Sequence, residues 1–352
     1  MTKERTVALS VIVPAYNAAK FLDSCLAPVM QSPAWVTECI VVDDGSSDNS
    51  AAIAIKHGAR LIRAEARGGS ARARNLGARA ATGTVLVFLD ADVSANPDTF
   101  ARIHSHFLND PELDALIGAY DDAPSDPGFL STYRNLLHCY VHRSANRRAF
   151  TFWTGCGAIR RAVLLDAGGF DESYKRPSIE DIELGYRLAR AGRKMLLDPD
   201  ITVKHRKHWS FFEIVRTDVC DRAVPWTELI LRHGALHNDL NLRIGQRISV
   251  ALAILLIPAA ALAPAYTVAP FFLCLGGLIV LNFPFYRFLA RRMSYAHALA
   301  AIPLHILFHF YSGIAFCAAL MKHIVAPRTP AANFVACTAQ SPRPQRALKT
   351  RP

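Results

Sequence analysis

The chain has 352 residues, of which 51% are hydrophobic, and a formal net charge of +11 at pH 7. This length allows one large domain with an appendage. The eight cysteines form no CxxC pair and no cluster with histidine at metal spacing, so we expect idle, reduced thiols and no structural zinc. No nucleic-acid motif accompanies the basic charge, so membrane lipids are the expected partner and nucleic acid is not.

Strand and helix patterns alternate through the N-terminal part of the chain. The expected strands are 9–13, 38–42, 60–63 and 85–89, and the expected helices are 18–30, 48–56 and 70–81. This alternation predicts an α/β fold with a parallel sheet and right-handed crossovers. Strand-like LSVIVPAYN follows the first residues at once and leaves no room for a signal-peptide core, so we expect this part to stay in the cytoplasm.

Two of these strands end in clustered carboxylates. VVDDGSSD occupies 41–48, and VLVFLDAD occupies 85–92. Ligands bind outside the carboxyl ends of parallel strands, so both strands should deliver their acids to one rim of the sheet. The acids are Asp43, Asp44, Asp90 and Asp92. Like charges gathered in one place are costly, which favours a divalent cation with a phosphorylated ligand among them.

Further elements are expected in the middle of the chain. A turn-rich loop at 121–128 precedes helices at 129–143, 161–167 and 179–191 and β-type segments at 150–159 and 194–197. Residues 211–232 mix apolar with charged positions. This pattern fits helices lying on a bilayer surface, and it equally fits an ordinary amphipathic helix packed on the sheet.

The C-terminal part contains two long apolar runs without Asp, Glu, Lys or Arg, at 248–286 and 293–321. The first is long enough for two spans with a turn near 264–270, and the second for one. Three spans, the favoured count, would leave the tail at 326–352 on the far side. That tail is basic, contains no acid and is predicted to be disordered, and its charge favours the cytoplasm. Either the charge bias fails here, or one apolar segment is re-entrant or interfacial.

At this point a family resemblance becomes clear. VIVPAYN, VVDDGSSDNS, GGSARARNLGARAATGTVLVFLDADV, GGFDE and IEDIELGYRLARAG occur in that order across about 7–208, and together they resemble family 2 glycosyltransferases of membrane-anchored bacterial type. The resemblance implies a GT-A fold, a Rossmann-like, mostly parallel sheet with helices on both faces. It further implies sugar transfer from a nucleotide diphosphate sugar, a UDP-sugar by preference, with inversion at the anomeric carbon.

The domain boundaries follow from the resemblance and from the apolar runs. Residues 1–208 would form the nucleotide-sugar-binding catalytic domain, and 209–246 juxtamembrane amphipathic helices. Residues 247–325 would form a transmembrane region of two or three spans, followed by the tail at 326–352. The expected location is the inner cell membrane, multi-pass, with the catalytic domain in the cytoplasm.

The Asp90-Ala-Asp92 segment is the expected metal site. Alternate residues of a strand point to the same side, and hard carboxylate oxygens suit Mg²⁺ or Mn²⁺. The resemblance makes Asp92 the direct ligand and places Asp90 near the ribose. His205 follows a strand and could complete the metal or diphosphate site, although a surface histidine in a basic stretch is the plainer interpretation.

Several residues are expected to bind the nucleotide sugar. The resemblance places Pro14 and Tyr16 around the base, and it makes Asp44 an acceptor of a hydrogen bond from the base or ribose. Arg74 and Asn75 would shape the donor site. The glycine-rich start of their helix could cradle phosphate.

Glu180 and Asp181 begin a helix, where carboxylates often only stabilise the helix dipole. The resemblance makes Asp181 the general base that removes the acceptor proton, with Glu180 in support. A phosphate acceptor would already be ionised and would need no such base. On the acceptor side the resembling residues are Trp153, Gly155 and Cys156, with Trp153 either stacking on a sugar or packing in the core.

The predicted function is therefore an inverting hexosyltransferase that acts on a lipid-linked or membrane-proximal acceptor in cell-envelope glycan synthesis. A processive polysaccharide synthase is one alternative, but no QxxRW motif is found, and the nearest string, 222–226, matches poorly. A non-catalytic nucleotide-sugar-binding scaffold is another alternative. The intact set of acids argues against it.

Overall fold

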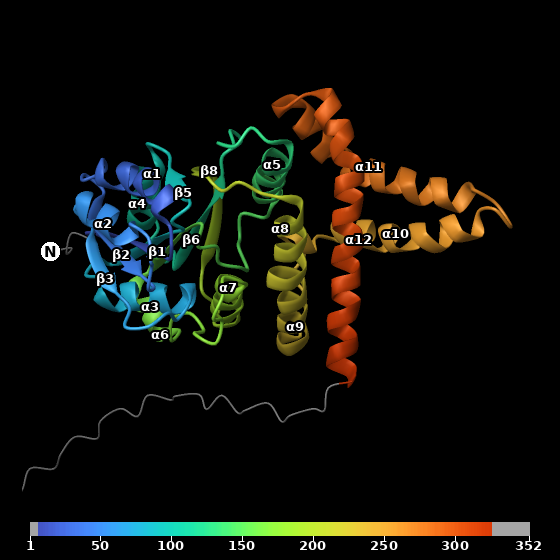
Figure 1. The fold of residues 1–352 in the computed structure, drawn as a ribbon. Helices are drawn as coiled ribbons and strands as arrows, with labels where there is room; N and C mark the ends of the chain where they lie inside the picture. Colours follow the sequence, from blue (N-terminus) through green and yellow to red (C-terminus); the bar gives the residue numbers. More distant parts are fainter. Residues whose placement is uncertain (1–5, 326–352) are drawn as a thin grey trace, which may run out of the picture.

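A computed structural model describes residues 6–325 of the chain, and its N-terminal domain is built on one eight-stranded sheet (Figure 1). The strands are β1 (Leu9–Ala15), β2 (Val36–Asp43), β3 (Arg60–Arg63), β4 (Val85–Leu89), β5 (Val93–Ala95), β6 (Ala115–Tyr120), β7 (Cys156–Arg160) and β8 (Met195–His205). The helices of this domain are α1 (Ala19–Met30), α2 (Ser50–Lys56), α3 (Ser70–Ala80), α4 (Thr99–Asn109), α5 (Phe129–Ser144), α6 (Arg161–Asp166) and α7 (Glu180–Arg190).

The strand order is β3-β2-β1-β4-β7-β6-β8-β5. β1 pairs in parallel with β2 and β4, β2 with β3, and β6 with β8. β7 runs antiparallel to both of its neighbours, and β5 runs antiparallel to β8. The expected Rossmann-like, mostly parallel sheet is confirmed. Because β2 and β4 flank β1 in the same direction, their carboxyl ends lie at one edge.

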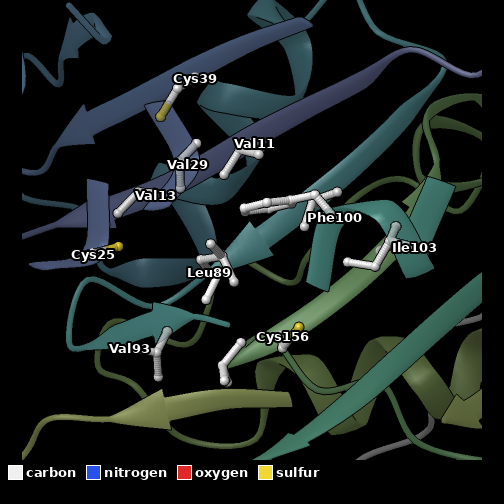
Figure 2. Close-up of a cluster of buried hydrophobic side chains, with 14 of the residues drawn as sticks. Val11, Val13, Cys25, Val29, Cys39, Leu89, Val93, Phe100, Ile103 and Cys156 are labelled. Atoms are coloured by element: carbon white, nitrogen blue, oxygen red, sulfur yellow. The ribbon is translucent and has the colours of Figure 1, made fainter. Parts of the chain in front are cut away.

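Alternating side chains of the buried strands supply two apolar cores, one on each face of the sheet. Val11 and Val13 of β1 face the first core, which α1 and α4 cover, whereas Ile12 faces the second core with α3, α6 and α7. Figure 2 shows the first core, where Phe100 of α4 and Leu89 of β4 lie among the β1 valines. The cysteines of the described part of the chain are all free thiols, and Cys337 lies outside it.

Some predicted elements differ from the observed ones. The β-type segment at 150–159 is a strand only from Cys156, because the residues before it lie against α7. A Cβ atom on Gly185 would come 2.3 Å from the backbone nitrogen of Phe152, so this close contact depends on glycine. The predicted strand at 194–197 is the start of the longer β8, and the sequence analysis did not predict α4 and β6.

The C-terminal part is helical. Its elements are α8 (Phe211–Arg216), the π-helix η1 (Thr217–Ala223), α9 (Val224–His233), the short 3₁₀ helix η2 (Leu240–Leu242), α10 (Ile244–Leu262), α11 (Ala269–Arg292) and α12 (Tyr295–Val325). Leu229 of α9 packs on Ile179 and Tyr186 beside the domain, whereas Phe212 of α8 is 82% exposed. The last three helices are long and apolar enough to cross a membrane. The predicted tail at 326–352 lies outside the described residues.

Candidate active site

The acids that end β2 are tied to nearby backbone. Each carboxylate oxygen of Asp44 accepts a hydrogen bond of 2.8 Å from a glycine N–H, one from Gly68 and one from Gly69. Gly69 has a φ of +92°, and a Cβ atom there would lie 2.8 Å from the carbonyl oxygen of Lys175, so only glycine fits the turn. Asp44 thus fixes the turn that opens α3. Its predicted contact with the base or ribose stays a prediction.

Tyr16 and Pro14 lie at the end of β1, next to the same edge. The Tyr16 ring is 42% exposed, and the guanidinium carbon of Arg67 lies 3.9 Å from its centroid. A flat aromatic face with a cation over it at the rim of a parallel sheet suits a planar base. The predicted role of both residues in the base pocket stays a prediction.

Arg74 joins three elements at the centre of the site. Its Nη2 donates to Asp90 Oδ1 at 2.7 Å, and its Nη1 donates to Glu180 Oε1 at 2.8 Å. The side chain is 4% exposed, so burial strengthens both ion pairs. Arg74 therefore links α3 to the end of β4 and to the start of α7. This arrangement brings together three residues that the sequence analysis singled out separately.

Asn75 points to a different partner from Arg74: it binds the backbone of a turn and not the acids of the site. Its Nδ2 donates to the carbonyl oxygen of Phe170 at 2.8 Å, and its Oδ1 accepts from the Phe170 N–H at 2.8 Å. A Cβ atom on Gly169 would lie 2.5 Å from Asn75 Oδ1. Asn75 thus holds the GGF turn that follows α6, and its predicted role in shaping the donor site stays a prediction.

Glu180 is fully engaged by hydrogen-bond donors. Its Oε1 accepts from Ser70 Oγ at 2.6 Å and from Arg74, and its Oε2 accepts from the Ser178 N–H at 2.8 Å. Burial alone would raise the pKa of Glu180, but the Arg74 charge and these hydrogen bonds together lower it. Glu180 is therefore a stable carboxylate that positions Arg74, and it is poorly suited to accept a proton.

Asp181, the next residue, has the opposite environment. Its Oδ1 accepts from the Ile182 N–H at 2.8 Å, and its Oδ2 accepts from the Thr154 N–H at 3.1 Å. Burial, and then the neighbouring Glu180 charge, raise the pKa of Asp181 to about 6, against the lowering effect of Arg74. A carboxylate with this pKa is the form that general-base chemistry near neutral pH requires.

The side chains of Asp92 and His205 meet at the end of β4. Asp92 Oδ2 lies 3.4 Å from His205 Nε2. The other ring nitrogen, Nδ1, lies 2.7 Å from Asn135 Oδ1 and donates to it, and the ring stacks on Tyr120 with centroids 4.6 Å apart. Nε2 therefore faces the Asp92 carboxylate oxygen, and both atoms are of the kind that ligates a divalent cation. An oxygen and a nitrogen in this arrangement suit a cation bound between them. The hydrogen bond from Nδ1 to Asn135 is the kind that orients a metal-bound histidine.

Asp92 and His205 fit a divalent cation whose coordination shell is completed by a bound ligand. Within residues 6–325, no three His, Cys, Asp or Glu side chains already surround one point. Mg²⁺ sites in nucleotide enzymes commonly use only one or two carboxylates, with phosphates and water as the other ligands. Asp92 and His205, with the Asp90 oxygen that Arg74 leaves free, match that composition.

Trp153, Gly155 and Cys156 line the start of β7. The Trp153 ring packs edge-on against Tyr120 and His142, with centroids 4.9 and 4.8 Å away, and a Cβ atom on Gly155 would lie 2.3 Å from this ring. Cys156 is 1% exposed and its thiol lies in the first core (Figure 2), where burial raises its pKa to about 12. The acceptor roles of the three residues stay predictions.

Two residues of the site had no role in the sequence analysis. Arg222 of η1 donates from Nη1 to His138 Nε2 of α5 at 2.9 Å, and the Asp181 charge acts on its guanidinium. Burial, and then the Arg222 charge, hold the pKa of His138 well below its usual range, so Arg222 has a neutral partner. The string that holds Arg222 was the poor match to QxxRW. Nothing in the sequence linked His138 to it.

Comparisons with known proteins point to one family. Residues 10–168 match the family model of glycosyl transferase family 2. The chain is 31% identical over 117 residues to glycosyltransferase GlyG of Streptococcus pneumoniae, an alignment that covers 32% of this chain and 38% of that protein. It is 29% identical over 223 residues to validoxylamine A glucosyltransferase of Streptomyces hygroscopicus, covering 53% of this chain and 52% of that protein. The chain thus spans less than two thirds of either relative.

A solved structure has the same fold. The mannosyltransferase PcManGT from Pyrobaculum calidifontis, determined with GDP-Man and Mn²⁺, superposes with a TM-score of 0.50 at 19% identity, covering 90% of this chain and 87% of that one. At this identity the likeness is one of fold. The family match and this likeness lead to one conclusion: residues 10–168 form a glycosyl transferase family 2 domain, and the fold is GT-A-like.

Proposed function

We propose that this chain is an inverting, metal-dependent glycosyltransferase that moves a sugar from a nucleotide diphosphate sugar to a lipid-linked or membrane-proximal acceptor. The observation that carries the proposal is the pair Glu180 and Asp181. One acid is held as a carboxylate by Arg74 and Ser70, while the pKa of the other is raised to about 6. Adjacent acids with pKa values moved apart are typical of assigned acid and base roles.

In this proposal the rim of the sheet holds the donor. Tyr16 and Pro14 contact the base, and Asp44 keeps the glycine turn at the start of α3 close to the diphosphate. Asp92 and His205, with Asp90, would hold Mg²⁺ or Mn²⁺, which supplies positive charge for the leaving diphosphate. PcManGT was solved with Mn²⁺, and this supports the same choice here.

Asp181 accepts the proton of the acceptor hydroxyl as that oxygen attacks the anomeric carbon. The bond from the sugar to the diphosphate breaks on the opposite face, which inverts the configuration. The Thr154 hydrogen bonds keep the Asp181 carboxylate in place at distances of 3.1 and 3.3 Å. Arg222, on the same side, offers positive charge to an acceptor that carries an anionic group, such as a lipid-linked one.

The test is a release assay on the full chain in detergent micelles, with a panel of UDP- and GDP-sugars and either Mn²⁺ or Mg²⁺. We expect metal-dependent release of nucleotide from one donor. In Asp92→Ala, the metal should no longer stimulate this release. Failure of every donor to release nucleotide would favour a non-catalytic nucleotide-sugar binder. Mass analysis of lipid extracts from cells with and without the chain then identifies the acceptor.

A further inference from the structure

Helix α12 has the length and composition of a membrane span, yet both of its ends contact the N-terminal domain or helices packed on it. Near its start, the His297 ring lies 5.8 Å from the ring of Phe129, the first residue of α5. Near its end, Lys322 Nζ lies 2.7 Å from Glu228 Oε1 of α9. These two contacts constrain where α12 can lie relative to a bilayer.

The two contact partners lie on the same side of any membrane. α5 is joined to the sheet through Asn135, which binds His205, and α9 packs through Leu229 on α7. Among the residues described before Ile244, no helix is long and apolar enough to cross a bilayer. The chain therefore has no crossing between α5 and α9, and both ends of α12 must share their side.

The distance between these contacts excludes a crossing. The helix rises about 38 Å from His297 to Lys322, whereas the hydrocarbon core of a bilayer is about 30 Å thick. A crossing helix of this length would separate Phe129 and Glu228 by a whole bilayer. A helix that lies along the membrane surface satisfies both contacts.

The middle of α12 also contacts a helix that packs on the N-terminal domain. Tyr311 Oη donates to Asp218 Oδ2 of η1 at 2.6 Å, and Asp218 is also paired with Arg134 of α5. In Figure 1, α12 runs beside α8 and α9, and the α10–α11 hairpin extends away from the opposite side of α12. Gly313 lets α12 pack closely against α10 where the two helices meet, since a Cβ atom there would lie 2.9 Å from the Val250 side chain.

The hairpin, by contrast, has the charge pattern of a membrane insertion. No charged residue occurs from Ile248 to Tyr286, and Tyr266 at the turn is 81% exposed. Basic residues stand at the two ends that join the domain. They are Arg243, Arg247, Arg287, Arg291 and Arg292. Arg292 is paired with Asp122 of the domain at 2.6 Å, so this end lies on the domain side.

We infer that only α10 and α11 enter the bilayer, as a hairpin, and that α12 lies in the membrane interface on the side of the catalytic domain. The partner of its outward face is lipid, because most of the exposed side chains between its two ends are apolar. They include Leu299, Leu307, Ile314, Phe316, Met321 and Ile324. With two crossings, Val325 ends on the domain side, which removes the conflict between three spans and the basic charge of residues 326–352. The inference does not depend on which sugar is transferred.

The first test uses sealed inverted and right-side-out vesicles that contain the full chain. One variant carries a specific protease site directly after Val325, and a reference variant carries the same site before Met1. We expect both sites to be cut from the same face of the membrane. Cleavage of the two sites from opposite faces would overturn the inference.

A second test measures the contact between α12 and α9 in the membrane. In a background with Cys220, Cys274, Cys317 and Cys337 changed to serine, the pair Glu228→Cys and Lys322→Cys should be joined by a short bismaleimide. The matched control pairs Glu228→Cys with Tyr266→Cys at the hairpin turn and should not be joined. If both cysteines of the first pair react with a monofunctional maleimide but do not cross-link, the interfacial position is wrong.

Discussion

The proposed donor rim and the proposed acceptor side of this site are built differently. At the rim, the oxygens of Asp44 and Glu180 are already paired with glycine amides, serine and Arg74. On the proposed acceptor side, Asp181 accepts hydrogen bonds only from the Ile182 and Thr154 amides and the Thr154 hydroxyl, with no cation of the described residues paired to it, and Arg222 has a neutral histidine as its partner. The rim is preorganised by its own residues. The proposed acceptor side keeps charged groups that are not paired with an opposite charge within residues 6–325, and the proposal assigns the acceptor as their partner.

The sharpest test of this comparison is Asp181→Asn, which removes the proposed base and keeps its shape. We expect kcat to fall by about 10²- to 10⁴-fold, the contribution of a general base. Donor affinity, measured by calorimetry with the nucleotide sugar and metal, should stay within a factor of two or so of the parent, by the same separation of chemistry from binding. A loss of donor affinity as large as the loss of rate would move Asp181 to the donor side.

The corresponding change at the rim is Arg74→Met, which should act on folding first. It leaves Glu180 buried and Asp90 partly buried without their shared cation. Breaking a buried pair of this kind costs about 3–5 kcal/mol, so thermal unfolding should move to clearly lower temperature. Arg72→Met in the same helix is the matched control, since its guanidinium donates to the carbonyl oxygen of Ala66 near the surface rather than to a buried acid. Equal unfolding temperatures for the two variants would contradict a preorganised rim.

Arg222→Gln tests the charge of the acceptor side. Hydrogen bonds to charged groups contribute about 1.5–3 kcal/mol, so KM for an anionic acceptor should rise roughly tenfold to a hundredfold. KM for the donor should not change. If the two KM values rise together, Arg222 contacts the donor diphosphate and the proposed division of the site is wrong.

The pH dependence of the reaction reports the pKa of Asp181 directly. Because only the carboxylate accepts a proton, kcat should rise tenfold per pH unit below about 6 and level off above it. The profile is measured at saturating donor and metal. An acceptor that is already ionised, such as a lipid phosphate, would give no such rise, and the role of Asp181 would then be lost.

The smallest expected effect is that of Tyr311→Phe in α12. It removes one hydrogen bond to the Asp218 carboxylate, which keeps its pairing with Arg134, so the free energy of unfolding should fall by about 1.5 kcal/mol, the low end for a hydrogen bond to a charged group. Phe310→Leu, a neighbouring change without a lost hydrogen bond, serves as the control in denaturant titrations in micelles. A change of activity without a change of stability would instead indicate that α12 influences Arg222 through η1.

The sequence by itself determined the mostly parallel sheet, the acids at its rim, the family resemblance of the N-terminal part and the apolar character of the C-terminal helices. These features depend on local patterns: strands that end in aspartates and long runs without charge. They can be predicted from the sequence because each depends on residues within a short stretch of chain.

Only the tertiary structure decided how those pieces are used. Asp44 holds a turn 24 residues away, Arg74 reaches Glu180 across 106 residues, and Arg222 meets His138 across 84. Burial, which separates the pKa values of the adjacent Glu180 and Asp181, is likewise a property of the packed molecule. The same holds for α12, because lipid and protein interiors both accept apolar residues, and only its contacts at both ends distinguish a surface helix from a span.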